Sequence, residues 1–201
     1  MLNAFTGKYI RQSMYQGKVV RLRKLNPSDA PTILPHWNVY DLDRYLPVSL
    51  PMSNEDMVRY IESVNEAFEN NSMLTFGIET LEDGHLIGII SLGSISWISR
   101  FGEIGHFAIF DLERRGRGYG ADALRVLLNM AFSVLELHSV YLWVEAFNKG
   151  AISFYENIGF KSQGRLRELG CRDGERHDVI IMDLLRTEFL EKYDLPLNDS
   201  L

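Results

Sequence analysis

The apolar and polar positions between Glu103 and Phe160 form the clearest pattern in the chain. Residues 103–110 alternate and contain many β-forming side chains, which predicts a strand. A turn rich in arginine and glycine follows at residues 114–120. Beyond it, apolar side chains recur at helical spacing, at Ala121, Leu124, Leu127, Leu128, Ala131, Phe132 and Leu135. The pattern therefore predicts a strand, a glycine turn and an amphipathic helix, in that order.

Shorter patterns on both sides of this unit predict further strands and helices. Strands are expected at residues 18–24, 74–80, 85–98, 139–145, 160–169 and 177–185. Helices are expected at residues 27–38, 53–70 and 150–157. Pro35 is expected to break the first of these helices. Ser53 and Asp56 have the spacing of a capping box, and two Asp-Gly pairs mark hairpin turns.

A single domain accounts for this chain of 201 residues. The helix after the glycine turn connects two strands, so the strands of Phe107 and Trp143 should be parallel neighbours that splay at their ends. The order of these elements therefore predicts an α/β (α+β) fold, with a mixed, largely antiparallel sheet of about seven strands and about four helices. The expected parts are an N-terminal extension, a domain and a C-terminal tail, at residues 1–17, 18–185 and 186–201.

Composition narrows the classes of partner and compartment. The net charge of −6 argues against a general nucleic-acid-binding protein and slightly favours a cationic acceptor. The one cysteine, Cys171, allows neither an internal disulfide nor a cysteine-based zinc site, so a reducing cytoplasm is the expected location. The five histidines lack the spacing of a metal site, so no metal is expected. No signal-peptide pattern and no apolar run of about 18 residues occurs, so no membrane partner is expected.

The glycine turn has the chemistry of an anion site. Glycines let the backbone approach a ligand, and the start of the following helix adds N–H groups and a positive dipole end, which together suit a phosphate. The three arginines of the turn add positive charge. A dinucleotide fingerprint is the alternative, but Gly116, Gly118 and Gly120 are spaced by two and two, unlike G-x-G-x-x-G. No P-loop is present either, since no Gly-Lys-Ser/Thr follows.

Two motifs of this region resemble those of the GNAT family of N-acetyltransferases. Arg115-x-x-Gly118-x-Gly120 matches the family's (Q/R)-x-x-G-x-(G/A) signature. Residues 151–160, AISFYENIGF, look like its A-I-x-x-Y-x-x-x-G-F motif. The resemblance covers about residues 18–185 and therefore nearly the whole expected domain.

Three further stretches agree with the order of elements in that family. Glu103 opens the central strand, and Asn148 follows the next strand. Residues 165–178 are similar to the C-terminal hairpin of the branch that contains the ribosomal-protein N-terminal acetyltransferases and the spermidine acetyltransferases. The resemblance implies the acyl-CoA N-acyltransferase fold, in which two central parallel strands splay apart.

The resemblance also implies acetyl-CoA as the acetyl donor, with no metal. The pyrophosphate would lie on the backbone of the glycine turn, and the pantetheine arm would bond the central strand as an added strand does. The residues that the resemblance assigns to CoA binding are Phe107, Ala108, Ile109, Arg114, Arg115, Gly116, Arg117, Gly118, Tyr119, Gly120, Ala121, Asn148 and Ser153.

Tyr155 occupies the tyrosine position of the second motif, and the resemblance implies that it is the general acid that protonates the leaving thiolate of CoA. A phenol suits that role because it is neutral at pH 7 and can donate. The acceptor ammonium must lose a proton before it attacks, and Glu103 is a candidate base, directly or through water. His106 should face the opposite side of a regular strand from Glu103. Glu145 and Glu79 are weaker candidates.

We therefore expect an enzyme that transfers acetyl from acetyl-CoA to a primary amine by direct attack in a ternary complex. The acceptor stays open among a protein N-terminus, a polyamine and another small amine, and a second copy of the chain is a candidate partner. Two other functions stay open as well: an acyl-CoA-binding sensor without chemistry and a nucleotide-binding oxidoreductase. The intact Tyr155 argues against the first, and the glycine spacing argues against the second.

Overall fold

The computed structural model describes residues 14–37, 51–172 and 174–194. Within them, the strands form one seven-stranded sheet in the order β1-β2-β3-β4-β5-β7-β6. The strands are β1 (Val20–Arg23), β2 (Met73–Thr80), β3 (Leu86–Ser96), β4 (Phe101–Ile109), β5 (Ser139–Glu145), β6 (Lys161–Arg172) and β7 (Glu175–Leu185). The α-helices are α2 (Ala30–Trp37), α4 (Asn54–Glu69), α5 (Tyr119–Ser133), α6 (Lys149–Ile158) and α7 (Arg186–Lys192).

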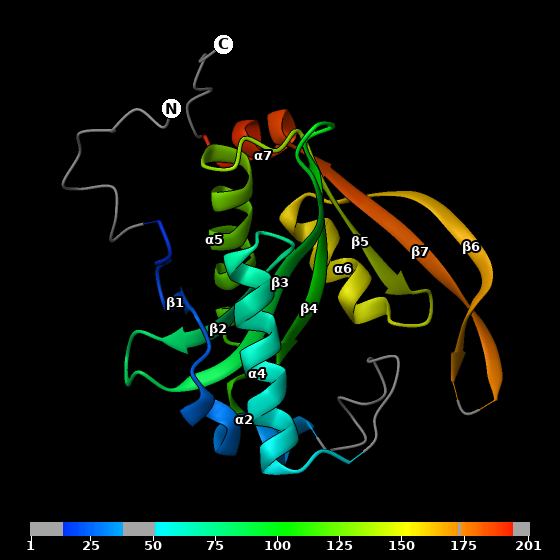
Figure 1. Ribbon diagram of the computed structural model, residues 1–201. Helices are drawn as coiled ribbons and strands as arrows, with labels where there is room; N and C mark the ends of the chain where they lie inside the picture. Colours follow the sequence, from blue (N-terminus) through cyan, green and yellow to red (C-terminus); the bar gives the residue numbers. More distant parts are fainter. Residues whose placement is uncertain (1–13, 38–50, 173, 195–201) are drawn as a thin grey trace, which may run out of the picture.

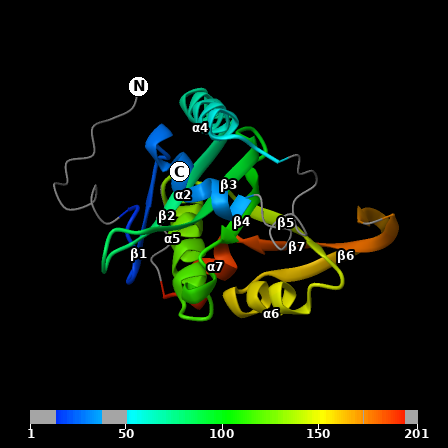
Figure 2. The same cartoon turned by 90° about the horizontal axis from the view of Figure 1, so that it is seen from below.

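The sheet lies between two layers of helices (Figures 1 and 2). Helices α2 and α4 cover one face, where Ile33 and Ile61 belong to an apolar cluster. Helices α5, α6 and α7 cover the other face, where the larger cluster contains Leu124 and Leu127. These two leucines belong to the helical repeat that predicted α5, so the periodicity identified the face that the sheet buries. The β6–β7 hairpin extends beyond the helices (Figure 1).

Strands β4 and β5 are parallel and touch only at their beginnings. Three register pairs join them, and they involve residues 101–103 of β4 and 139–141 of β5. Every other neighbouring pair of strands is antiparallel. The predicted parallel pair in a mixed sheet is therefore confirmed, and the strands beyond these pairs, including Phe107 and Trp143, are not joined to each other.

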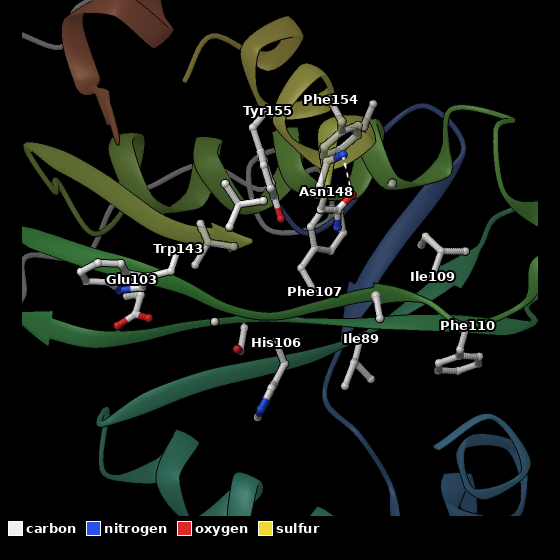
Figure 3. Close-up of a pocket in the computed structure, with 18 of the residues that line it drawn as sticks. Ile89, Glu103, His106, Phe107, Ile109, Phe110, Trp143, Asn148, Phe154 and Tyr155 are labelled. Carbon is white, nitrogen blue, oxygen red and sulfur yellow. Dashed lines mark hydrogen bonds between the residues drawn. The ribbon is translucent and has the colours of Figure 1, made fainter. Parts of the chain in front are cut away.

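An irregularity in β4 changes which side chains share a face. Ile90 of β3 pairs with Phe107, and Leu92 pairs with Ile104, so two steps along β3 match three steps along β4. A β-bulge of this kind inserts one residue and reverses the alternation of side chains. Glu103 and His106 consequently point to the same face, toward α4 (Figure 3). The expectation that they face opposite sides was wrong, because it assumed a regular strand.

The start of the fold agrees with the prediction of a short helix that ends at or near Pro35. A 3-10 turn at Pro27–Asp29 leads directly into α2, which passes through Pro35 and ends at Trp37. A proline removes one backbone donor from a helix, but only two residues of helix follow Pro35, so the loss is confined to the last turn. The predicted capping box of α4 is present, since Ser53 and Asp56 each accept the other's backbone N–H.

A buried carboxylate connects β1 to the beginning of α5. The Asp122 side chain is almost completely buried and accepts hydrogen bonds from the N–H groups of Val19 and Val20, at 2.8 and 3.2 Å from Oδ2. Gly17 passes so close that a Cβ there would lie 2.4 Å from the same oxygen. The expected N-terminal extension mostly falls on residues 1–13, which lie outside the described residues.

Candidate functional site

A cavity of about 1290 Å³ opens where β4 and β5 separate. It is lined from both faces of the sheet (Figure 3). We call the part that contains Phe107, Asn148 and Tyr155 the α5 side, and the part that contains Glu103 and His106 the α4 side. The backbone of β4 lies between them, so a ligand held on the α5 side reaches the α4 side through the gap.

Tyr155 projects from α6 into the α5 side, with its hydroxyl directed toward β4 (Figure 3). Its ring packs against Phe107, Phe154 and Phe160, at centroid distances of 6.5, 5.3 and 5.7 Å. Burial raises the pKa of Tyr155 to about 12. The side chain is therefore neutral at physiological pH, and its O–H is a proton donor at the cavity wall.

The predicted glycine turn forms the end of the α5 side. Gly116 and Gly118 have φ values of 75° and 87°, which L side chains rarely adopt. Gly118 is the N-cap of α5 and offers no side chain, so the first N–H groups of the helix have no side-chain acceptor there. A Cβ at either glycine would meet nothing within 4 Å. The turn therefore combines open space with unpaired N–H donors at a positive dipole end, which fits a pyrophosphate.

The three arginines of the turn differ in their partners. Arg114 is bonded to Asp83, at 2.6 Å, and contacts Asp111, at 3.2 Å. The hydrogen bond that Arg114 donates to Asp83 raises the pKa of the Arg114 guanidinium, whose charge is thus largely balanced by protein carboxylates. Arg115 donates from Nε to the carbonyl of Ile109, at 2.8 Å, which fixes its side chain along the cavity. Arg117 is exposed and does not line the cavity.

Asn148 caps a helix and also lines the cavity. Its Oδ1 caps α6 by accepting the N–H of Ala151 at 3.1 Å. Because that oxygen must be the acceptor, the amide nitrogen of Asn148 points elsewhere and can donate to a ligand in the cavity that the residue lines. Ser153, by contrast, is exposed and lies outside the lining of the cavity. All the residues that the resemblance assigned to CoA except Arg117 and Ser153 line it, namely Phe107, Ala108, Ile109, Arg114, Arg115, Gly116, Gly118, Tyr119, Gly120, Ala121 and Asn148.

On the α4 side, two hydroxyls hold the carboxylate of Glu103. Ser94 Oγ and Tyr141 Oη donate to Oε2, at 3.0 and 3.1 Å. Burial, together with the negative charge of Glu103, raises the pKa of Tyr141, which keeps its phenol a donor. Both bonds end on Oε2, so Oε1 can accept from a ligand. No local pattern could predict either hydroxyl, because Ser94 and Tyr141 reach Glu103 from other strands.

His106 lies beside aromatic rings on the same side. Its Nδ1 is 3.4 Å from the hydroxyl of Tyr60, and its ring packs edge-on against Trp37 and Tyr60, each at 6.4 Å between centroids. Burial lowers the pKa of His106 and raises that of Tyr60 to about 12, so both are uncharged at neutral pH. Trp37 and His106 line the cavity.

The two weaker candidate bases have protein partners. Glu79 is buried and ion-paired with Arg21 and Arg23 at the β1–β2 pair, and it does not line the cavity. Glu145 lines the cavity, but its Oε2 is 2.8 Å from Nε2 of His177. Glu103 therefore has the acidic side chain best placed to receive a proton from a ligand.

The residues that the structure describes contain no group of three or more His, Cys, Asp or Glu side chains that could hold a metal ion. None of their helices is long and apolar enough to cross a membrane.

Comparisons with known proteins identify relatives across the domain. The spermidine N(1)-acetyltransferase of Vibrio cholerae is 30% identical over 131 residues, which cover 65% of this chain and 74% of that protein. The Bacillus subtilis protein YdaF, whose name describes a ribosomal N-acetyltransferase, is 30% identical over 174 residues, 85% of this chain and 93% of its own. A crystal structure of spermidine N-acetyltransferase from Vibrio cholerae with CoA and spermine superposes with a TM-score of 0.75. That match has 28% identity and covers 85% of this chain and 98% of the other.

The family model described as the acetyltransferase (GNAT) domain matches residues 20–161. This range contains β1 to α6 and ends at the first residue of β6, so it includes the splayed strands, the glycine turn and Tyr155. The chain belongs to the GNAT family of acetyltransferases.

Proposed function

We propose that the protein transfers the acetyl group of acetyl-CoA to a primary amine. The observation that carries the proposal is the single cavity that joins the glycine turn, the Tyr155 hydroxyl and the Glu103 carboxylate across the gap between β4 and β5. A donor bound along the α5 side would present its thioester between a proton donor and a proton acceptor. Among the described residues, these three groups of the cavity are sufficient for such a reaction.

The residues of the α5 side fit CoA as a substrate. The open N–H groups at the start of α5 and the guanidinium of Arg115 would hold the pyrophosphate. The amide nitrogen of Asn148 and the backbone of β4 beyond residue 103, which has no partner strand on the β5 side, would bond the pantetheine arm. Bound acetyl-CoA supplies the activated acyl group, and the protein orients it.

Three proton transfers balance the reaction. The acceptor arrives as an ammonium, and Glu103 takes its first proton through Oε1 or through a water, which frees the nitrogen lone pair for attack. Tyr155, whose pKa of about 12 keeps its phenol protonated at neutral pH, donates that proton to the departing thiolate. The second proton of the attacking nitrogen then returns to the Tyr155 oxygen, directly or through water, which leaves the neutral amide and restores the phenol. Direct transfer within a ternary complex needs no nucleophilic side chain. The thiol of Cys171 is exposed near the end of β6.

The test is release of free thiol from acetyl-CoA in the presence of a panel of amines. Thiol release that depends on both the protein and an amine, with the acetylated amine found by mass spectrometry, supports the proposal. A sensor would bind CoA and release no thiol with any amine. A nucleotide-binding oxidoreductase would be stabilised against heat by NAD or NADP and not by CoA. Either of the last two results would overturn the proposal.

We also propose that the protein forms a homodimer in a reducing, cytoplasmic environment. Support for the dimer comes from Leu166 and Leu169, which are 42% and 54% exposed on β6, the free edge of the sheet. Support for the compartment comes from the free, exposed thiol of Cys171. Sedimentation equilibrium checks the first statement, and a monomer at all concentrations up to that of the cell would contradict it.

A further inference from the structure

Flat aromatic side chains line part of the α4 side of the cavity. Trp37 and His106 form one part of it, with the ring of Tyr60 packed behind them. Trp143 lines the cavity from β5, 41% exposed, and its ring packs edge-on against Tyr141 at 6.3 Å. Tyr141 donates to Glu103, so the aromatic surface continues to the carboxylate.

The charges on this side are few. The only carboxylates of the described residues that line the cavity are those of Glu103 and Glu145. Glu145 Oε2 is 2.8 Å from His177 Nε2, and Glu103 has one oxygen left for a ligand. Of these two carboxylates, that of Glu103 is therefore the better placed to pair with a cationic nitrogen. A linear polyamine would bring further ammonium groups against aromatic rings and the uncharged His106. A ring face attracts an ammonium more weakly than a charge-assisted hydrogen bond to a carboxylate does, so these groups would gain less than the first ammonium gains at Glu103.

We propose that the acceptor is a primary amine with one positive charge and a planar apolar group next to it. Its ammonium would meet Glu103, and its planar group would lie on the rings of Trp37, His106 and Trp143. This inference rests on the proposed acetyl transfer and names the acceptor class. The same chemistry is found in a free arylalkylamine and in a peptide that begins with an aromatic residue.

The experiment compares kcat/KM for four acceptors at saturating acetyl-CoA: 2-phenylethylamine, a tripeptide beginning with phenylalanine, hexylamine and spermidine. Contact of one aromatic ring with the cavity rings should favour 2-phenylethylamine over hexylamine by about tenfold. Spermidine should be the poorest of the four. If the peptide exceeds 2-phenylethylamine, the source of the aromatic amine is a polypeptide N-terminus, and if it is slower, the source is a free amine. Either order supports the acceptor class.

A matched pair of variants tests the aromatic surface. The chain has three tryptophans, of which Trp37 and Trp143 line the cavity and Trp97 does not. Trp143 and Trp97 are 41% and 49% exposed, so replacing either by leucine should leave the fold intact. Trp143→Leu should abolish most of the roughly tenfold preference for 2-phenylethylamine over hexylamine, whereas Trp97→Leu should leave the preference unchanged.

Two results would overturn the inference. One is a kcat/KM for spermidine equal to or above that for 2-phenylethylamine, and the other is an unchanged preference in Trp143→Leu. In both cases acetyl transfer to amines would still be observed, so the proposed function would stand. If no amine in a wider panel releases thiol, the proposed function itself fails, which is a different outcome.

Discussion

The proposed acetyl transfer depends on single side chains of the cavity. The role of Tyr155 as general acid can be tested most directly. Tyr155→Phe removes one hydroxyl and keeps the ring that packs on Phe107, Phe154 and Phe160. Because a general acid contributes about 10²–10⁴-fold in rate, kcat should fall by that factor while KM for acetyl-CoA changes little. Steady-state kinetics and the melting temperature, measured on the same preparation, check this.

The two measurements separate an acid from a packing residue. If Tyr155 were only structural, the melting temperature would fall and activity would follow the folded fraction. A kcat near that of the wild type would contradict the acid role and leave water as the proton source.

His106 gives a prediction about pH. Burial lowers its pKa below the ordinary value of about 6.5, so as the pH falls through that value the unfolded chain takes up a proton before the folded protein does. The folded state therefore loses stability below about pH 6.5, and the loss grows until the folded-state pKa is passed. Its neighbours Tyr60 and Trp37 carry no charge that would oppose this shift.

The measurement is the free energy of unfolding of wild type and His106→Gln between pH 8 and pH 5. The difference between the two proteins should be constant above pH 7 and should move in favour of the variant as the pH falls. A difference that is flat over the whole range would show that His106 does not have a lowered pKa.

At the scale of elements, the glycine turn and α5 form one unit, and Gly118 tests it. Gly118→Ala strains the backbone at φ 87° and places a methyl group in the phosphate space. Gly174, in the distant β6–β7 turn, has φ 80° and equally open surroundings, so Gly174→Ala applies a similar strain far from the cavity. Both variants should lose similar stability, of about 1 kcal/mol.

Only Gly118→Ala should also weaken CoA binding, by tenfold or more, as measured by calorimetry (about 1.4 kcal/mol). Equal CoA affinities of the two variants would mean that the turn does not hold the pyrophosphate.

The Asp122 carboxylate, which connects β1 to α5, gives a second prediction at the scale of elements. Asp122→Ala removes the acceptor of two backbone N–H groups in a buried place, each of which then costs about 1–3 kcal/mol. Asp122→Asn keeps one acceptor oxygen and should cost less. Denaturant unfolding of the two variants gives the comparison. An Asp122→Ala protein as stable as the wild type would show that water replaces the carboxylate.

The elements were largely predictable because their signals are local. The apolar repeat of α5, the Ser53–Asp56 box and the Asp-Gly turns each lie within a few residues of one another. The bulge in β4 was not predictable, since it depends on the register of β3 against β4 and has no signature in the residues themselves. The error about His106 followed directly from it.

The candidate site was predictable to the extent that it follows the family motifs. Tyr155, Asn148 and the glycine turn are contiguous patterns, and their side chains or backbones line the cavity. The partners of Arg114 and Glu103 come from distant segments, so spacing could not reveal that Arg114 is bound to Asp83 or that Tyr141 holds Glu103. The aromatic surface of the α4 side was missed for the same reason.

At the scale of the whole molecule, the narrow contact between β4 and β5 has a consequence for unfolding. It divides the backbone hydrogen bonds of the sheet into two ladders. One ladder contains β1, β2, β3 and β4, the other contains β5, β7 and β6, and three register pairs between β4 and β5 join them. Helix α5 packs on strands of both ladders, with Leu127 fully buried in the shared core, so we expect this helix to make the two ladders unfold as one unit. We therefore expect cooperativity to depend strongly on side-chain packing on this helix.

Leu127→Ala should accordingly do more than destabilise the protein by about 2–5 kcal/mol. It should broaden the denaturant transition and lower its m-value, because part of the molecule can open while the rest stays folded. Saturating CoA, which would contact both β4 and α6, should sharpen the transition again. A transition as steep as that of the wild type would mean that the three register pairs between β4 and β5 are enough to make the two ladders unfold together.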